Sequence, residues 1–356
     1  MPRAHATSDS STARRPVYLI GAGAIVREAH EPSYRRLGLA IAGVFDLEAE
    51  RARKLAQATG GRSFESMATL AEACSADGGV LDLAVPPQAI AGVLPHIPSG
   101  TAVLLQKPFG RDLGEATRLL QLARSRSLVG AVNFQLRHAP VVRALRGLVA
   151  SGAIGEPLDL EMRVVCRMPW ENWSFLEGMP RMEVLMHSIH YLDLARALFG
   201  EPERVWCATA RHPAAPRIAD TRSTTAMTFG PTRRAVVTTY HHHAAPSGHE
   251  ASHLRIEGTH GTAVARLGVN LDYPTGRPDT LEWSRDGGAW TPVAVEGNWF
   301  PDAFGNAMLA LQSFAAGASD LLESNLEDAW RTMALVETCY KSAAAGETLP
   351  PPPTEN

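Results

Sequence analysis

The chain has 356 residues, of which 45% are hydrophobic and 20% are charged, and its formal net charge is −3. This length and composition are typical of a globular protein with two domains. The charge balance shows neither a basic stripe nor an acidic tail, so we expect neither nucleic acid nor a membrane surface as a partner. No apolar stretch reaches the roughly 18 residues that a membrane-spanning helix needs.

Four cysteines lie far apart and form no C-x-x-C pair. This pattern is typical of a reduced, cytoplasmic protein rather than of a disulfide framework. Residues 1–15 are rich in Ser, Thr, Ala and Arg, which predicts a disordered leader. The segment ARRPVYLIGAGAIV is similar to a twin-arginine export signal, but two glycines interrupt its apolar run, and we favour a cytoplasmic location.

Short apolar strands alternate with helices over residues 16–138, a pattern that predicts a doubly wound parallel sheet. Right-handed crossovers bring the C-terminal ends of all these strands to one edge, where ligands bind. Strands are expected within 16–26, 40–46, 78–87, 101–108 and 128–135, and helices at 47–59 and 112–127.

From residue 139 the strands become longer and alternate more clearly between apolar and polar residues. They predict a mostly antiparallel sheet with one less buried face, so 139–348 is expected to be an α+β domain and 349–356 a frayed tail. Strands are expected within 157–168, 204–212, 223–230, 234–244, 252–266 and 279–293, and helices at about 181–199, 302–317 and 326–345.

A glycine-containing turn follows the first predicted strand. Gly21-Ala22-Gly23-Ala24-Ile25-Val26 leads from that strand into a helix. In a dinucleotide site the first glycine forms the tight turn, and the second lets the backbone approach the pyrophosphate at the helix N-terminus. Val26 stands where the fingerprint has Gly or Ala, so a glycine turn with a purely steric role is the alternative.

Asp46 supports the dinucleotide interpretation. It ends the second predicted strand, 25 residues after Gly21, where a carboxylate accepts hydrogen bonds from the hydroxyls of an adenosine ribose. An N-cap of the helix at 47–59 is the alternative role. Leu47 and Glu48 follow and offer no basic side chain for a 2′-phosphate. We therefore expect NAD as the cofactor, with NADP the weaker candidate.

Three further motifs complete a family pattern. They are Gln106-Lys107-Pro108 after the fourth strand, His190-Tyr191-Leu192-Asp193 on a helix of the second part, and VNFQLRHAP at 132–140. With the glycine turn and the acidic residue described above, they make the chain resemble the glucose–fructose oxidoreductase / inositol dehydrogenase (Gfo/Idh/MocA) family over nearly its whole length. The resemblance implies a Rossmann domain followed by an α+β domain with an open, mostly antiparallel sheet.

The resemblance also implies a function. Family members transfer a hydride reversibly between a nicotinamide and a secondary alcohol carbon of a sugar or cyclitol that binds between the domains. The open sheet face implies a homodimer or homotetramer, and no metal is implied. The cofactor-binding residues carried over by the resemblance are Gly21, Gly23, Ala24, Ile25, Asp46, Val85, Pro86, Gln106, Lys107, Asn133 and Gln135.

Lys107 and His190 are the expected catalytic residues. Removal of a hydride from a CH–OH carbon leaves a carbonyl only if a base takes the hydroxyl proton, and a buried lysine of lowered pKa can do this. In the family the histidine hydrogen-bonds the reacting hydroxyl. A surface lysine and a core histidine are the alternatives. Asp193 is expected to hold the helix or the contact between domains.

Two positions depart from the family pattern. The family has Glu where this chain has Gln106, and many members have Asp where this chain has Met186, one helical turn before His190. The loss of two acids predicts a lower pKa for the neighbouring lysine. Either the lysine and the histidine suffice, or Glu183 or His187 takes the missing role. A metal held by these histidines and Glu183 is an alternative that we do not favour.

Three histidines at 241–243 are expected on a strand, where His242 points away from its neighbours, and a surface or interface role is favoured for them. Trp170 and Trp173, in the loop before the His190 helix, are expected to stack on the apolar face of a sugar ring, and packing of the loop is the alternative.

The sequence thus predicts an NAD-dependent dehydrogenase of a sugar, glycoside or cyclitol. The expected substrate-binding residues are Lys107, Trp170, Trp173, Glu183, His187 and His190. Two rivals remain open, namely a redox-neutral glycoside-cleaving enzyme that retains NAD, and a non-catalytic sensor that binds NAD. A reductase of keto-sugars would differ from the first prediction only in physiological direction.

Overall fold

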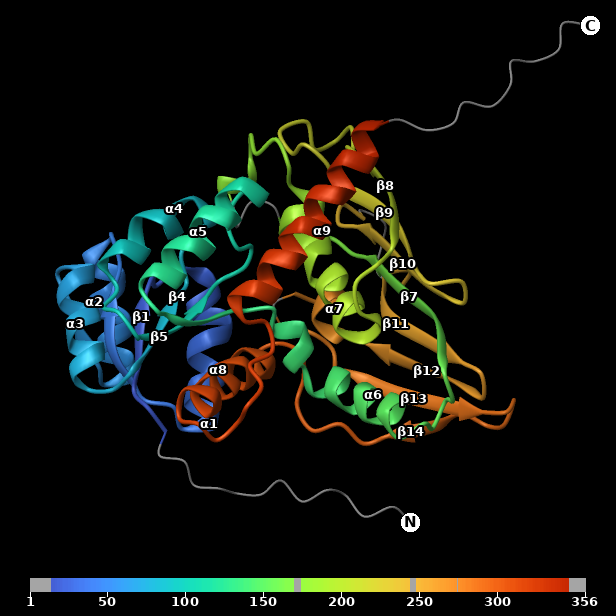
Figure 1. Cartoon of the computed structure of the whole chain (residues 1–356), viewed down its shortest axis with the longest axis horizontal. Coiled ribbons are helices and arrows are strands. Elements are labelled where there is room, and N and C mark those ends of the chain that lie inside the picture. The colour runs from blue at the N-terminus through green and yellow to red at the C-terminus, as the bar shows by residue number, and fades with distance from the viewer. Residues whose placement is uncertain (1–13, 170–173, 244–247, 274, 346–356) are drawn as a thin grey trace, which may run out of the picture.

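The computed structural model describes residues 14–169, 174–243, 248–273 and 275–345. Two halves lie side by side, each built on its own sheet, and the long helix α9 (Leu326–Ala345) runs between them (Figure 1). In the part of the chain that the structure describes, no helix combines the length and the apolar character needed to cross a membrane.

The first half contains a six-stranded sheet of order β3-β2-β1-β4-β5-β6, with all neighbouring strands parallel. This is the strand order of a Rossmann fold, and it confirms the predicted fold class. Every residue of the central strands β1, β4 and β5 is buried, as expected for a sheet covered on both faces. The strands are β1 (Val17–Ile20), β2 (Ile41–Phe45), β3 (Arg62–Ser63), β4 (Val80–Leu83), β5 (Ala102–Leu105) and β6 (Val129–Val132).

Alternate residues of these strands face two layers of helices. Val17 and Leu104 pack with α1, α2 and α8 (Asp302–Ala315) on one face, whereas Ile20 and Leu105 pack with α3, α4, α5 and α9 on the other. The helices of this half are η1 (Val26–His30), α1 (Glu31–Leu37), α2 (Ala49–Thr59), α3 (Met67–Ala76), α4 (Pro87–Val93), η2 (Leu94–His96), α5 (Leu113–Ser125) and η3 (Gln135–His138).

Two helices from the end of the chain return to the first half. Met308 and Leu311 of α8 (Asp302–Ala315) join the core on one face of the Rossmann sheet. The N–H of Val132, at the end of β6, donates to the carbonyl of Ser324 just before α9 (2.8 Å). A Cβ on Gly130 would lie 2.6 Å from Leu326, so only glycine leaves room for the start of α9. The first half is therefore completed by distant residues.

The second half contains an eight-stranded sheet of order β14-β13-β12-β11-β7-β10-β9-β8. Only the pairing of β10 with β7 is parallel among its neighbouring strands in the described residues, which confirms the mostly antiparallel sheet. The predicted strand at 252–266 is two strands joined by a tight turn. The strands are β7 (Pro157–Val165), β8 (Arg204–Ala210), β9 (Arg222–Phe229), β10 (Arg233–Tyr240), β11 (Ala251–Gly258), β12 (Gly261–Arg266), β13 (Thr280–Arg285) and β14 (Thr291–Val293).

One face of this sheet is covered by helices, and apolar residues such as Leu160 and Leu254 point toward them. The helix predicted at about 181–199 consists of a π-helical segment, η6 (Glu183–Ser188), that continues as α7 (Ile189–Phe199). The other helical segments of this half are α6 (Pro140–Ala150), η5 (Ser174–Leu176) and η7 (Gly268–Leu271).

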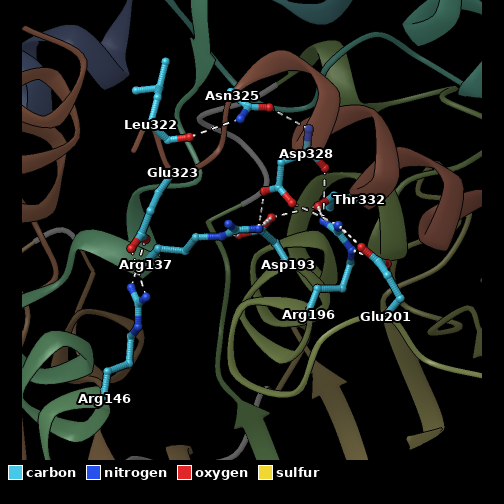
Figure 2. A network of polar contacts seen from close by, with 10 residues as sticks. All are labelled: Arg137, Arg146, Asp193, Arg196, Glu201, Leu322, Glu323, Asn325, Asp328 and Thr332. Atoms are coloured by element: carbon cyan, nitrogen blue, oxygen red, sulfur yellow. Dashed lines mark hydrogen bonds and ion pairs between the residues drawn. The ribbon is translucent and has the colours of Figure 1, made fainter. Parts of the chain in front are cut away.

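A buried ionic network joins the two halves (Figure 2). Arg137, at the end of the Rossmann half, donates two hydrogen bonds of 2.6 Å to the carboxylate of Asp193 on α7. The same guanidinium lies 2.7 Å from Asp328 on α9. Thr332, also on α9, donates to Asp193 at 2.8 Å. This arrangement agrees with the prediction that Asp193 holds the contact between domains.

Candidate active site

A cavity of about 840 Å³ lies where the C-terminal edge of the parallel sheet meets the second half. Such an edge is where doubly wound folds bind their ligands. Its walls include residues that the sequence analysis assigned to the cofactor or the substrate, namely Gly21, Gly23, Ala24, Ile25, Asp46, Val85, Pro86, Gln106, Lys107, Gln135, His187 and His190.

Among the predicted site residues that the structure describes, Asn133 and Glu183 are not on the wall. Asn133 is fully buried, and neither end of its amide has a partner among the described residues. Glu183 is buried behind the wall, where its carboxylate contacts the side chain of His241. Trp170 and Trp173 lie outside the described residues.

The two glycines of the first turn differ in what surrounds them. Gly21 has a φ of +105°, and a Cβ there would lie 2.4 Å from the carbonyl oxygen of Ala84, so backbone geometry alone requires glycine. A Cβ on Gly23 would meet nothing within 4 Å, and this glycine lies on the cavity wall. The second glycine therefore leaves open the space that a dinucleotide pyrophosphate would fill.

Asp46 lies at the end of β2 and fixes the glycine turn. One carboxylate oxygen accepts the N–H of Ala22 (2.7 Å), and the other accepts the N–H of Glu48 (2.8 Å). Arg51 also lies on the wall but is paired with Glu48 at 2.8 Å. Arg51 and Glu48 therefore form an exposed ion pair close to Asp46.

Lys107 directly follows β5 and lies on the cavity wall. Its ammonium donates a hydrogen bond to the carbonyl of Met186 in η6 (2.7 Å). Among the described residues no carboxylate lies within ion-pairing distance of this ammonium to stabilise its charged form. Burial therefore acts unopposed and lowers the pKa of Lys107 to about 8. A substantial fraction of this lysine is therefore the free amine at mildly alkaline pH.

Gln106 uses both ends of its amide beside that lysine. Its Oε1 accepts the backbone N–H of Lys107 (2.8 Å), and its Nε2 lies 3.3 Å from Nε2 of the buried His30. Nδ1 of His30 lies 2.7 Å from Asp82, which also accepts the hydroxyl of Tyr34. A neutral amide thus stands where the family has a carboxylate.

His190 lies on the same wall and is 8% exposed. Its Nδ1 has no hydrogen-bond partner among the described residues. Burial first, then the charge of Lys107, lowers the pKa of His190 well below its usual range. The ring contacts Trp299 edge to face, with centroids 5.8 Å apart. A neutral imidazole with an unpartnered nitrogen is suited to hydrogen-bond a ligand hydroxyl.

The histidines at 241–243 do not all fit the surface role predicted for them. His241 is only 2% exposed, and its Nδ1 lies 2.9 Å from both carboxylate oxygens of Glu183. The ring of His187 lies beside it, with centroids 4.6 Å apart, and both rings reach the cavity. The prediction was wrong for His241 because the strand end packs against η6, which the strand pattern alone does not reveal.

Several wall residues were not singled out from the sequence. Tyr191 and Asn270 are joined by a hydrogen bond of 3.0 Å. Tyr273 donates to Glu28 of η1 (2.5 Å) and so links the two halves at the cavity. Trp299 lies beside both His190 and Tyr191. Tyr191 stands inside the recognised helix motif, and this was the one signal that pointed to it.

Comparison with protein-family models matches the chain twice. Residues 16–134 match the oxidoreductase family with an NAD-binding Rossmann fold, and residues 142–264 match the GFO/IDH/MocA C-terminal domain. The chain belongs to the Gfo/Idh/MocA family. This Gfo/Idh/MocA protein is therefore an NAD-binding oxidoreductase, as the sequence analysis predicted.

Two curated relatives indicate the kind of chemistry. D-apiose dehydrogenase of Paraburkholderia graminis is 26% identical over 350 residues, which cover 93% of this chain and 88% of that protein. Inositol 2-dehydrogenase of Leifsonia xyli is 32% identical over 167 residues, which cover 46% of this chain and 47% of that protein. The relatives are dehydrogenases and reductases of sugars and cyclitols, so this family member is an enzyme that acts on CH–OH groups.

A solved structure shares the fold over most of the chain. It is an oxidoreductase from Agrobacterium radiobacter in complex with NAD⁺, L-tartaric acid and magnesium, with a TM-score of 0.75 and 23% identity. The match covers 94% of this chain and 98% of the other. At this level of identity the likeness concerns the arrangement of both halves.

Proposed function

We propose that this protein is an NAD-dependent dehydrogenase of a secondary hydroxyl on a sugar, glycoside or cyclitol, with Lys107 as the general base and His190 as its partner. The observation that carries the proposal is a lysine of lowered pKa and a neutral histidine on the wall of one cavity. The names of the relatives support the substrate class.

The proposed cofactor site occupies the Rossmann part of the cavity. Gly23 leaves space for the pyrophosphate, and Asp46 stands where the ribose hydroxyls are expected. The pairing of Arg51 with Glu48 supports NAD over NADP. When bound, the nicotinamide takes or returns the hydride.

The proposed chemistry at Lys107 is proton removal. The free amine takes the proton of the reacting hydroxyl, and the carbonyl of Met186 holds the ammonium that results. His190 donates or accepts a hydrogen bond at the same oxygen through its free ring nitrogen and so orients the substrate. In the reverse direction the protonated lysine returns its proton to the carbonyl oxygen. The apolar faces of Trp299 and Tyr191 are suited to the C–H face of a ring.

A pH profile of Lys107→Met tests the base. We expect the kcat of oxidation to fall about 10²–10⁴-fold, because general-base catalysis typically contributes that much. In the unchanged enzyme kcat should rise with pH and level off above about 8, since only the free amine accepts a proton. Reduction, which needs the ammonium, should show the opposite limb.

The matched control is Lys54→Met, which removes an exposed lysine of α2 outside the cavity. This control should keep both the rate and the pH limb. Binding of NADH by Lys107→Met, followed by fluorescence, should show that the cofactor site is intact. A variant that keeps more than a tenth of the kcat would refute the base assignment.

A substrate panel separates the proposal from its two rivals. NAD⁺ reduction should be measured against sugars, glycosides, sugar acids and cyclitols, together with release of the aglycone from the glycosides. Net NADH formation supports the proposed dehydrogenase. Release of the aglycone without net NADH formation would identify the redox-neutral glycoside-cleaving enzyme. Cofactor binding with no turnover of either kind would identify the sensor.

We also propose a cytoplasmic homodimer or homotetramer assembled through the open face of the eight-stranded sheet. Glu161 and Arg163 of β7 and Arg255 of β11 point to that face, away from the buried apolar residues that alternate with them. Light scattering of the purified protein should show two or four subunits, and a monomer would refute the assembly.

The cysteines support the proposed cytoplasmic location. All four are free and buried, in keeping with a reducing compartment.

A further inference from the structure

Three side chains at the substrate end of the cavity carry nitrogen and oxygen atoms that lie close enough together to hold a metal ion. Glu183 and His187 are four residues apart in η6, and His241 directly follows β10. One ligand atom from each lies within 4.8 Å of the other two. Nδ1 of His241 is 2.9 Å from both carboxylate oxygens, and Nδ1 of His187 is 3.9 Å from Oε2.

The carboxylate of Glu183 is already oriented by its neighbours. The hydroxyls of Ser188 (3.0 Å) and Thr239 (2.8 Å) both donate to Oε1. Ser223 contacts both hydroxyls, at 2.9 and 2.8 Å, and so extends the network. Oε1 is therefore occupied by hydroxyl donors, and Oε2 is left facing the two imidazoles. Such outer contacts are what orient the ligands of metal sites.

The surroundings of this carboxylate include two imidazoles but no lysine or arginine within ion-pairing distance among the described residues. Glu183 is fully buried, and within the described ranges no lysine or arginine forms an ion pair with it; His187 and His241 are its only ion-pair partners. An ionised carboxylate in the interior is costly unless it is paired or coordinates a metal. A divalent cation between the carboxylate and the two imidazoles would balance it.

We propose that Glu183, His187 and His241 bind a divalent transition-metal ion, such as Zn²⁺, at the substrate end of the cavity. Two histidines and one glutamate are a donor set of zinc enzymes, in which the remaining coordination position stays open. Here that position faces the cavity, because both histidines lie on its wall. A substrate hydroxyl coordinated there would be acidified by the metal beside Lys107. The site goes beyond the proposed hydride transfer and supplies an electrophile on the side of the cavity where the family's aspartate is missing.

Metal binding can be measured without turnover. The full-length protein is treated with a chelator, dialysed, and titrated with Co²⁺, whose visible absorption reports coordination by nitrogen and oxygen ligands. Zn²⁺ is titrated in competition with a chromophoric chelator. We expect one equivalent of either ion per chain. His187→Gln and His241→Gln should each weaken binding at least tenfold, since even outer contacts of metal sites are worth about 10–100-fold.

The matched control is His242→Gln, which changes the neighbouring histidine outside the cavity and should leave the affinity unchanged. NADH binding and the thermal midpoint show that each variant is folded. If His241→Gln does not fold, His187→Gln decides, because that side chain lies at the cavity wall and is 15% exposed. No stoichiometric binding, or equal binding by the histidine variants, would overturn the metal site and leave a hydrogen-bonded Glu183–His241 pair. Because the readout is binding, a failure here says nothing against the proposed dehydrogenase.

Discussion

Gln106 places a neutral amide, and not a carboxylate, beside the proposed base. Its Oε1 accepts the backbone N–H of Lys107, and its Nε2 donates toward His30. Nδ1 of His30 lies 2.7 Å from Asp82, so the tautomer with its proton on Nδ1 can donate to that carboxylate and accept from the Gln106 amide. A glutamate at position 106 would offer no N–H to His30 and would add a negative charge next to the lysine.

Gln106→Glu should therefore move the ascending limb of the oxidation profile to higher pH. A carboxylate near Lys107 favours the ammonium, so the pKa of the lysine should rise above its value of about 8, by roughly one unit. Below the limb, the rate of oxidation should then fall about tenfold. The control is Gln121→Glu, the same change on the exposed surface of α5. An unshifted limb in Gln106→Glu would show that the amide does not control the lysine.

At the level of elements, the segment from η6 to α7 presents two histidines to the cavity near one end and forms a buried ion pair with the first half further along. His187 and His190 reach the cavity, whereas Asp193 is buried at the contact with Arg137 and α9. Arg196 on α7 adds a second link, because it pairs with Asp328 at 3.0 Å. The position of the proposed catalytic histidine thus depends on an ionic network that the cavity does not include (Figure 2).

Asp193→Asn tests this network. The change leaves the buried guanidinium of Arg137 without its full counter-charge, and loss of one partner of a buried pair typically costs about 3–5 kcal/mol. We expect the free energy of unfolding in urea to fall by about that amount, and KM for the substrate to rise as His190 loses its support. Asp159→Asn breaks the exposed pair with Arg234 and should cost at most about 1 kcal/mol. Equal losses in the two variants would show that the network is not an anchor.

For the whole molecule, periodicity and turn residues were sufficient to predict both sheets and the sheet edge at which the cavity lies. They could not predict contacts that depend on packing between distant elements. His241 was misassigned because its neighbour Glu183 lies in another element, and the return of α8 to the first half leaves no mark in the pattern of residues 302–315. A structural role for Asp193, in the helix or in the contact between domains, could be predicted because the residue belongs to the motif, but its ion pair with Arg137 could not.

This return of α8 predicts that the two halves unfold together. Leu311 is fully buried in the core on one face of the Rossmann sheet, so Leu311→Ala should lower the free energy of unfolding by about 2–5 kcal/mol. Loss of NADH binding and loss of the far-ultraviolet circular dichroism signal should share one urea midpoint, shifted by the same amount. Leu321→Ala is the matched control, because that side chain is 68% exposed and should change stability by about 0.5 kcal/mol or less. Separate midpoints, with NADH binding lost while strand signal remains, would mean that the cores of the two halves are independent.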